Sequence, residues 1–486
     1  MKTIIRLSVI GLILAALVGC YVAIDDGSGN LGIVLPDPRV STDVANADFA
    51  RVYILLGPDL VPVGDGTDYK EFDLESEGGE AQTSASVLVP AGADYQAILV
   101  LGNKQAGATG NQNFVPTNYA VSGLFSIGPG AEVILDLDLK TSPFVPVDPD
   151  VTLGRDLLGV VATNADVYVA TSTQVFVDGG GTPSSIGSLD FALADDLRPG
   201  EQIVSISQSA ISSGPAMMAN TSLGVVPFVG TTATTDFDQN MPADVGLPIL
   251  DSGGINIGGA ESYGYLEFAG GITGYKTNGF AWMSPADLSE IVTGEALYDL
   301  AVSDEGSIFW GYFATKLGAF RFREDVISLP PETTIDKIFE EHTNFFEVTV
   351  NGNQAVITQL ALNRTDPDKI YLGTRRGAVV IDEDQLTDTF GETTTITNPP
   401  VIAGTENQEV LDIFVEGRGA TALVAILTEH FLTVSSDGGT TFKSIPVYAS
   451  SAAGTIADML VSSGSPDVVL LAGSQGLAGV DIADIQ

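Results

Sequence analysis

Alternating apolar and polar positions recur along most of this chain, and they predict β-strands rather than helices. In the run 133–139, apolar side chains occupy positions 133, 135, 137 and 139, with Asp136 and Asp138 between them. Successive residues of a strand point to opposite faces of a sheet, so this run buries one face and exposes the other to water. Similar runs, separated by Pro-Ala-Gly and Gly-Pro-Gly turns, lie at 51–56, 84–89, 95–100 and 119–127. They predict an all-β chain that starts with a small β-sandwich over residues 48–142.

A weak internal repeat fills residues 154–486. Each unit has an inner apolar strand, a second strand that ends just before a Thr or Ser, and a hairpin into a third strand. The residue before that Thr or Ser stands at positions 170, 314, 373, 427 and 473, and weaker copies lie near 219 and 269. This spacing predicts a seven-bladed β-propeller, with six blades as the alternative because units two and three are the weakest. We expect residues near 145–156 to supply a fourth strand to the last blade and close the ring.

The first twenty residues have the pattern of an export signal. Two basic residues precede an apolar run over residues 7–18, which is too short to span a membrane comfortably. The run ends in Leu-Val-Gly19-Cys20, which resembles the lipobox of bacterial lipoproteins. The resemblance implies cleavage after Gly19 and a diacylglycerol thioether on Cys20, with palmitate-type acyl chains. An ordinary secretory signal is the alternative, and it is disfavoured because the only cysteine of the chain falls at this position.

The lipobox divides the rest of the chain. We expect a signal peptide over 1–19 and a flexible lipidated tether over 20–47, which is rich in Asp, Gly, Ser, Asn and Pro. A Pro-rich stretch over 143–153 is interpreted as a linker between the sandwich and a propeller over 154–486. Tyr21 stands where an Asp would mark inner-membrane retention in some bacteria. This favours the outer membrane, on its periplasmic or its surface face.

The charge of the chain narrows the possible partners. It carries a formal charge of −42, with only 20 Lys and Arg among 486 residues. Phosphate binding requires clustered cations, so nucleic acid is excluded. We interpret the acidity as a solubility feature, with cation storage as the alternative. Export argues against nucleotide cofactors, and no cofactor is expected.

Two further patterns resemble families of exported proteins. The strand order of residues 48–142 is similar to that of prealbumin-like or immunoglobulin-like accessory sandwiches. A stretch in the sixth unit resembles the Asp-box of sialidase-type propellers, with Ser435, Asp437, Gly439, Thr441 and Phe442 at its fixed positions. We expect Asp437 to accept backbone N–H groups of its own loop and Gly439 to adopt a positive φ. The motif is a folding device in the families that carry it, so it predicts fold rather than chemistry.

No catalytic set can be assembled from the sequence. The Arg-Ile-Pro that the sialidase resemblance requires is absent, so no catalytic residue is transferred. The only histidines, His342 and His430, are expected in surface turns. The acidic run over 382–388 lacks the Gly and the bidentate Glu of an EF-hand loop, so it predicts a solvated turn and no metal site. We therefore expect a protein that is not an enzyme.

One set of polar residues follows the repeat. Asp299, Gln359, Asp412 and Asp458 each stand near the start of an inner strand, at intervals of 60, 53 and 46 residues. In a closed ring they would lie at equivalent heights near one mouth of the central channel. Convergent oxygens at such a mouth can bind a cation or a polar ligand. The alternative is that each bonds to neighbouring backbone where its strand begins.

The sequence as a whole predicts a lipid-anchored cell-envelope protein. Its partners would be the membrane, through the lipid on Cys20, and an envelope protein or a glycan. We expect the propeller to be a non-catalytic binding or scaffolding module. The alternative is a carbohydrate-binding or glycoside-hydrolysing propeller similar to the sialidases.

Overall fold

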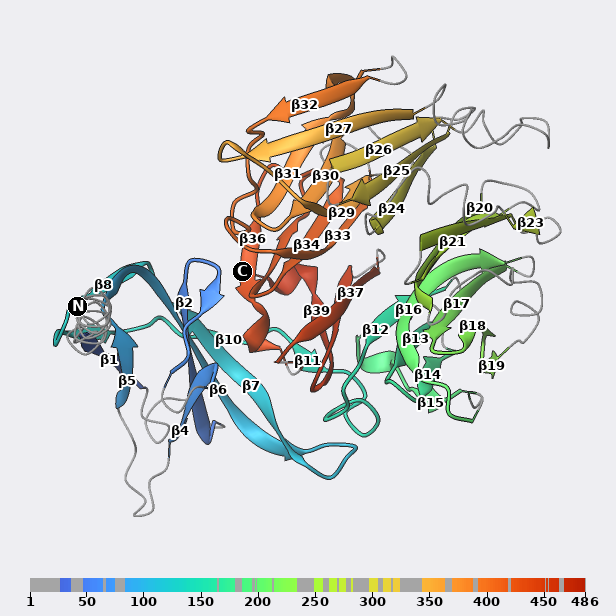
Figure 1. The fold of residues 1–486 in the computed structure, drawn as a ribbon. Helices are drawn as coiled ribbons and strands as arrows, with labels where there is room; N and C mark the ends of the chain where they lie inside the picture. Colours follow the sequence, from blue (N-terminus) through green and yellow to red (C-terminus); the bar gives the residue numbers. More distant parts are fainter. Residues whose placement is uncertain are drawn as a thin grey trace, which may run out of the picture. The chain divides into compact units, whose positions relative to one another are not determined.

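The computed structural model shows a chain of β-strands joined by turns and short 3-10 helices (Figure 1). The described residues are 27–35, 47–63, 67–74, 84–163, 166–179, 186–194, 197, 199–211, 214–233, 249–256, 262–268, 271–276, 281–282, 297–304, 309–315, 318–323, 343–362, 369–387, 392–417, 421–450, 452, 454–462 and 467–485. The expected signal peptide and Cys20 lie outside them. Within these residues, no helix is long and apolar enough to cross a membrane. The prediction of an all-β chain is confirmed.

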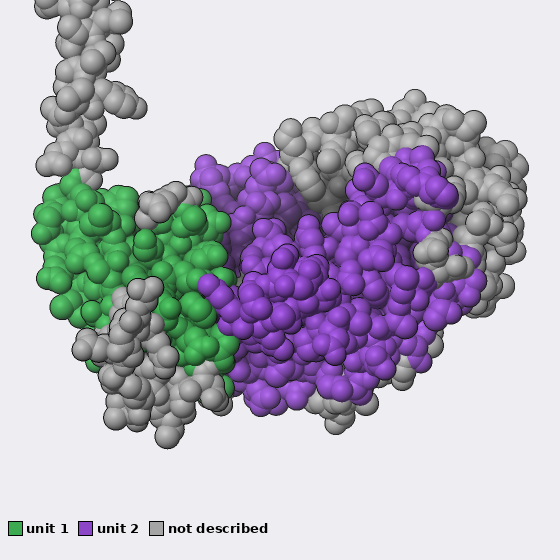
Figure 2. Space-filling model, turned by 90° about the horizontal axis from the view of Figure 1, so that it is seen from below, with its two compact units in different colours: residues 1–103, 117–141 green, residues 104–116, 142–486 purple. Residues whose placement is uncertain are grey.

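The chain divides into two compact units. Unit 1 contains residues 1–103 and 117–141, and unit 2 contains residues 104–116 and 142–486 (Figure 2). Unit 2 therefore includes the tip of a hairpin whose two strands belong mostly to unit 1. Within unit 2, Ala108 N of this tip donates a hydrogen bond to Leu153 O at 2.8 Å.

Unit 1 is a β-sandwich of two sheets. The smaller sheet has the order β5 (Ser84–Pro90), β1 (Ser28–Val34), β9 (Glu132–Leu135). The larger sheet has the order β10 (Lys140–Thr141), β7 (Gln112–Val121), β6 (Gly92–Ala106), β2 (Phe49–Leu56), β3 (Asp59–Leu60), with β4 (Tyr69–Asp73) on β2 and β8 (Phe125–Ile127) on β6. Leu31 and Val87 of the smaller sheet share one buried cluster with Val52 and Leu99 of the larger. Burial of these apolar faces is the main force that holds the two sheets together.

Strand β1 corrects the predicted tether. Residues 28–34 were expected to be flexible, but they form the central strand of the smaller sheet, antiparallel to β5 and parallel to β9. Leu31 and Ile33 are fully buried, and Leu35 extends their alternation. Gly and Asn between these apolar residues made the run look like a linker, because the partner strands lie 50 to 100 residues further along the chain. Only residues 21–27 separate Cys20 from β1.

Unit 2 contains seven sheets among its described residues, antiparallel except for one parallel pair, and this number supports seven propeller blades rather than six. Each blade begins with an inner strand, and these are β12 (Gly159–Ala162), β16 (Ile203–Ile211), β20 (Ile249–Asn256), β24 (Leu297–Asp304), β29 (Ile357–Leu362), β33 (Val410–Glu416) and β37 (Ile456–Ser462). Inner strands contact each other in the order β12, β16, β20 and in the order β24, β29, β33, β37, and β37 also contacts β12. Blades 7 and 1, which are farthest apart in the sequence, are therefore neighbours.

The remaining strands continue each blade outward from its inner strand. Blades 1 to 3 add β13 (Val167–Ala170), β14 (Val175–Asp178), β15 (Ala192–Leu193); β17 (Gly214–Thr221), β18 (Gly224–Val229), β19 (Thr232–Ala233); and β21 (Ser262–Phe268), β22 (Gly271–Lys276), β23 (Ala281–Trp282). Blades 4 and 5 add β25 (Phe309–Thr315), β26 (Gly318–Arg323), β27 (Thr343–Val350), β28 (Asn353–Gln354); and β30 (Lys369–Thr374), β31 (Gly377–Asp382). Blades 6 and 7 add β34 (Leu423–Thr428), β35 (Phe431–Ser435), β36 (Lys443–Pro446); and β38 (Val468–Gly473), β39 (Gly476–Asp481). Short 3-10 helices are η1 (Ile186–Ser188), η4 (Glu383–Gln385), η6 (Val447–Ala449) and η7 (Ile482–Asp484).

Blade 7 is completed by a strand from the start of unit 2. Strand β11 (Val145–Pro146) pairs antiparallel with β39, so that blade 7 has the order β11, β39, β38, β37. Val147 N adds a hydrogen bond to Leu477 O at 3.0 Å. The expectation that residues near 145–156 supply the fourth strand is confirmed. Closure buries blade faces that an open array would leave exposed.

Blade 4 takes up a strand from the segment that follows blade 5. Strand β32 (Thr393–Thr397) follows blade 5 in the chain, yet it pairs parallel with β27 of blade 4, from Phe345↔Thr393 to Thr349↔Thr397. Blade 5 is left with the three strands β29, β30 and β31 in its own sheet. The outer edge of blade 4 is thereby covered, which removes a row of unpaired backbone groups.

The Thr of the repeat closes a tight turn between the second and third strands of a blade. Thr221 Oγ1 donates to Gly224 O at 3.0 Å, and Thr374 Oγ1 donates to Gly377 O at 2.7 Å. Gly377 has φ +115°, and a Cβ there would lie 2.7 Å from Thr405 O, so glycine is required. The Thr that marks the repeat in the sequence is therefore a turn residue.

Candidate functional site at the inner strands

An irregularity in strand pairing recurs at the start of six inner strands. The pairing skips one residue in each of blades 2 to 7, as between Val410 and Asp412. We call the residue after the skip the post-bulge residue. It is polar in all six blades, namely Ser205, Asp251, Asp299, Gln359, Asp412 and Asp458. The four residues proposed from the sequence thus share one position in the fold. Ser205 and Asp251 were missed because they belong to blades 2 and 3, where the repeat is weakest.

Two post-bulge carboxylates bond to the backbone of the following blade. Asp299 Oδ2 accepts a hydrogen bond from Leu360 N at 2.7 Å, and Asp458 Oδ2 accepts one from Val160 N at 2.9 Å. Asp458 Oδ1 also accepts the N–H of Met459 at 2.8 Å. The sequence left open whether these residues bind a ligand or bond to neighbouring backbone, and Asp299 and Asp458 bond to backbone. Their contacts link blade 4 to blade 5 and blade 7 to blade 1. A carboxylate that accepts backbone N–H groups makes a stronger bond than a neutral acceptor.

Blade 1 has no such skip, and it carries a glycine at the corresponding position. Gly159 pairs with Ala170 at the end of β13, which is the place that Asp458 and the others take in their own blades. A Cβ on Gly159 would lie 2.9 Å from Asp458 Oδ2 and 2.9 Å from Ile206 Cγ1. The glycine therefore leaves the space into which the Asp458 carboxylate reaches.

Asp412 lies within electrostatic reach of two other post-bulge carboxylates. Burial raises the pKa of Asp412 well above its usual range, and the negative charges of Asp458 and Asp299 raise it further. A bond from the N–H of Ile413 acts in the opposite direction. Asp412 therefore holds its proton to a higher pH than an ordinary aspartate, and in that form it can donate a hydrogen bond. The structure brings these three carboxyl groups together.

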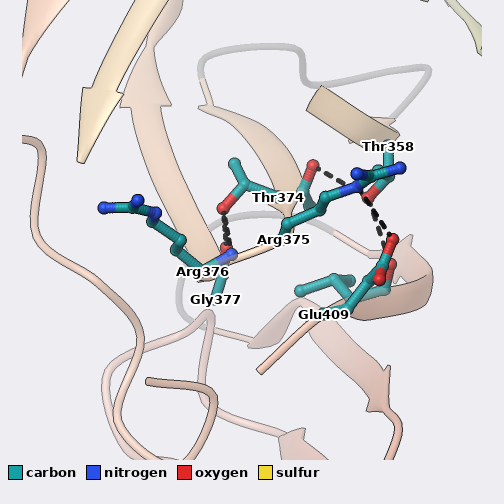
Figure 3. A network of polar contacts seen from close by, with 8 residues as sticks. Thr358, Thr374, Arg375, Arg376, Gly377 and Glu409 are labelled. Atoms are coloured by element: carbon teal, nitrogen blue, oxygen red, sulfur yellow. Dashed lines mark hydrogen bonds and ion pairs between the residues drawn. The ribbon is translucent and has the colours of Figure 1, made fainter. Parts of the chain in front are cut away.

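Gln359, the fourth predicted residue, is half-buried beside a polar network between blades 5 and 6. Figure 3 shows this network, in which Thr358 Oγ1 donates to Val410 O at 3.1 Å. Arg375 Nε lies 3.3 Å from Glu409 Oε1, and 59 % of the Arg375 side chain and 36 % of the Glu409 side chain are exposed. An exposed ion pair contributes little to stability, so the buried Thr358 contact is the stronger link between these blades.

The loop over residues 435–442 joins β35 to β36 and is organised by Asp437. Asp437 Oδ1 accepts the N–H of Thr440 at 3.1 Å and of Thr441 at 2.9 Å, and Oδ2 accepts the Thr441 hydroxyl at 2.6 Å. The Thr441 hydroxyl and these N–H groups hold the pKa of Asp437 well below its usual range. Ser435 Oγ accepts the N–H of Gly439 at 3.0 Å, and Gly439 has φ +78°. Phe442 packs against the buried cluster of blades 5 and 6. Each of these side chains serves the loop itself.

The prediction that His430 lies at the surface is wrong. His430 is only 6 % exposed, and its Nδ1 shares a hydrogen bond of 2.7 Å with the hydroxyl of Tyr448. Tyr448 belongs to η6, which follows β36 and covers the β34–β35 turn. The sequence shows the turn but not the later segment that folds over it. The other histidine, His342, lies outside the described residues.

The acidic run over 382–388 is a short 3-10 turn at the end of blade 5. Asp382 and Asp384 are exposed, which agrees with the solvated turn predicted there, and Asp388 lies outside the described residues. Glu383 of this turn forms an ion pair with Arg321, which is buried in β26 of blade 4. Sequence reasoning missed this pair because 62 positions separate its members. Among the described residues, no group of three or more His, Cys, Asp or Glu is arranged to hold a metal ion.

Comparison with known proteins gives likenesses of fold. No protein-family model and no curated protein matches the chain. PorZ, a bacterial surface component of the type-IX secretion system of Porphyromonas gingivalis, aligns with a TM-score of 0.43 and 12 % identity over 69 % of this chain and 37 % of that one. The extracellular domain of BT3049 from Bacteroides thetaiotaomicron aligns with a TM-score of 0.43 and 10 % identity over 79 % of this chain and 50 % of that one. A chain of the mitotic checkpoint complex aligns with a TM-score of 0.41 and 9 % identity, covering 70 % of this chain and 93 % of its own.

These three proteins have different roles, and the alignments are too distant to transfer any of them. The chain spans about a third of the length of PorZ and about half of the BT3049 domain. The likeness is one of β-rich architecture, shared with surface and extracellular proteins among others.

Proposed function

We propose that this chain is a lipid-anchored protein of the bacterial cell envelope, whose propeller binds or scaffolds a partner without catalysing a reaction. The observation that carries the proposal is the use of Asp299 and Asp458 as bonds between neighbouring blades. Carboxylates committed to backbone N–H groups stiffen the ring rather than act on a substrate. The lipobox that ends at Cys20 supports anchoring at a membrane.

The charge of the chain indicates the kind of partner. A formal charge of −42 repels other acidic surfaces and favours a partner with a basic face. Seven blades, with blade 7 beside blade 1, present a broad surface, which is suited to a protein or a polymer rather than to a small molecule. An exported protein with a basic surface, or an envelope glycan, fits this description.

The test is crosslinking in the native cell, purification through a C-terminal tag, and mass spectrometry of the captured material. We expect one stoichiometric envelope protein, and we expect wild-type protein in the membrane fraction. The matched control is Cys20→Ala, which removes the lipid attachment atom and should release the protein from membranes. Empty capture from well-expressed, membrane-bound protein would contradict the scaffolding role while leaving the anchor intact.

A second candidate function is glycoside hydrolysis or carbohydrate binding. It is favoured by the raised pKa of Asp412 beside Asp299 and Asp458, because a glycosidase keeps one carboxyl group protonated near a second, ionised one. A panel of glycans tested with wild-type protein and with Asp412→Asn separates the two functions. Turnover by the wild type that falls at least about a hundredfold in the variant would favour the enzyme. If no glycan in the panel is hydrolysed, the glycosidase function is contradicted and the non-catalytic binding function is favoured.

A further inference from the structure

Strand β1 shortens the connection between the proposed lipid anchor and the folded protein. Cys20 and Ser28, the first residue of β1, are eight positions apart. Eight residues span at most about 29 Å when fully extended. The start of β1 therefore lies within about 29 Å of the atom that carries the lipid, which is less than the thickness of a bilayer with its headgroups.

The end of β1 nearest the anchor is flanked by two turns of the same sandwich. Ala91 N donates to Gly27 O at 3.0 Å, and Gly130 N donates to Ser28 O at 3.0 Å. The turns at 90–92 and 128–130 thus stand beside the point where the chain enters the sheet. From there β1 runs along the middle of the smaller sheet, between β5 and β9.

The outer face of this sheet exposes large apolar side chains. Leu88 on β5 is 66 % exposed, Ile134 on β9 is 64 % exposed, and Val34 on β1 is 43 % exposed. Leu88 pairs across to Asn30, and Ile134 pairs across to Gly32. The strand geometry places these two pairs about 7 and about 13 Å along β1 from Ser28, with Leu88 and Ile134 about 12 Å apart. Single exposed apolar residues are ordinary, but here three share one face of a sheet whose central strand begins eight positions after Cys20.

The β5 and β1 part of the same face carries no charge in a strongly acidic chain. The outward positions of β5 and β1 are all uncharged, and they are Ser84, Ser86, Leu88, Pro90, Ser28, Asn30, Gly32 and Val34. On β9, Glu132 shares the face with Ile134, and Asp136 and Asp138 continue the exposed alternation just beyond the end of β9. The β5 and β1 part of the face, which has no charged side chain, can approach a phospholipid surface with less repulsion than an acidic face.

We propose that the outer face of the β5–β1–β9 sheet rests on the lipid bilayer, with Leu88 and Ile134 in the headgroup region. The proposal depends on the anchoring at Cys20 proposed above. The short connection keeps this face close to the membrane. The lipid on Cys20 then provides the membrane affinity, and the apolar side chains determine only which face of the protein is turned to the bilayer. The lipid holds the protein at the surface, and the sheet sets which side faces it.

The chain is well suited to a labelling test because Cys20 is its only cysteine. Single-cysteine variants Leu88→Cys and Ile134→Cys are made in the full lipidated protein, labelled with an environment-sensitive fluorophore and reconstituted in phosphatidylcholine vesicles. Matched controls are Leu56→Cys, at the end of a strand of the larger sheet, and Leu193→Cys on β15 of unit 2, which are 40 % and 51 % exposed. We expect blue-shifted emission and quenching by spin-labelled lipid at 88 and 134, and water-like emission at 56 and 193.

The outcomes separate this inference from the anchoring on which it rests. If wild-type protein reacts with a maleimide, its Cys20 thiol is free, and both the anchor and the docking are overturned. If the protein stays with the vesicles but labels at 88 and 134 remain water-like, the anchor stands and the docking fails. A shift seen in cells but not in vesicles would assign the face to a protein partner instead. Because Glu132 lies on this face, adding phosphatidylglycerol should weaken the shift, and a stronger shift would also contradict the proposal.

Discussion

Three of the post-bulge residues, Asp299, Asp412 and Asp458, differ in the backbone groups to which their carboxylates bond. Asp299 and Asp458 each accept an N–H of the following blade, and these contacts give their negative charge a partner. Asp412 instead bonds to the N–H of Ile413, the next residue along its own strand, and stands near the charges of the other two. The fold thus brings Asp412 near two other carboxylates, and burial together with their charges raises its pKa.

Asp412→Asn should remove this pH sensitivity. Because the pKa of Asp412 is raised in the folded protein, its contribution to stability is complete below the ordinary pKa of aspartate and is lost as the pH rises through the raised value. At pH 7 the asparagine variant should therefore be more stable than the wild type, on the order of 1 kcal/mol. Urea denaturation at pH 4 and pH 7 checks this. A variant that is less stable than the wild type at pH 7 would contradict it.

Asp458 should matter to the ring through its oxygen atoms rather than its charge. Asp458→Ala leaves the N–H groups of Val160 and Met459 without their acceptor, which costs about 1–3 kcal/mol of unfolding free energy. Asp458→Asn keeps an acceptor and removes a charge beside Asp412, so it should lie close to the wild type. Denaturant midpoints of the two variants distinguish these effects. Equal losses in both would mean that the charge itself is needed.

Elements that repeat were predictable from the sequence, and elements that depend on a distant partner were not. The Thr–x–x–Gly turns and the polar residues near the inner-strand starts recur at blade spacing, so local pattern was enough to find them. Strand β1 was missed because its burial depends on β5 and β9, and nothing in the run of Gly and Asn indicates those partners. The burial of His430 was missed for the same reason, because Tyr448 covers it from a later element. The Arg321–Glu383 pair likewise joins two blades.

The closing strand offers a prediction at the scale of elements. Val147 N donates to Leu477 O at the end of the β11–β39 pair, and the Val147 side chain is buried. Val147→Pro removes this donor and should destabilise the closure by about 1–3 kcal/mol, the cost of leaving the Leu477 carbonyl without its partner. Val147→Ala is the control for lost side-chain volume. Hydrogen exchange of β39 should rise strongly in the proline variant and only modestly in the alanine variant.

The predicted class was reached at the scale of the whole molecule, because a sandwich followed by a propeller follows from patterns that extend over hundreds of residues. The binding partner could not be predicted from these repeated patterns. A propeller binds through its loops and its surface charge, and these vary from blade to blade without leaving a repeat in the sequence. The acidic total charge is the one feature of the sequence that bears on the partner, and it favours the basic surface proposed above.

The closing strand also sets an order of events in the life of the chain. Val145 and its partner Gly479 are 334 positions apart, whereas every strand of the sandwich lies within the first 141 residues. A chain that emerges from its N-terminus can therefore complete the sandwich early, while the blades accumulate as an unfinished arc with apolar faces exposed to proteases and to one another. This exposure ends only when β39 has been synthesised and pairs with β11. A truncation at Gly476, which removes eleven residues, would leave the arc as open as the loss of a whole blade.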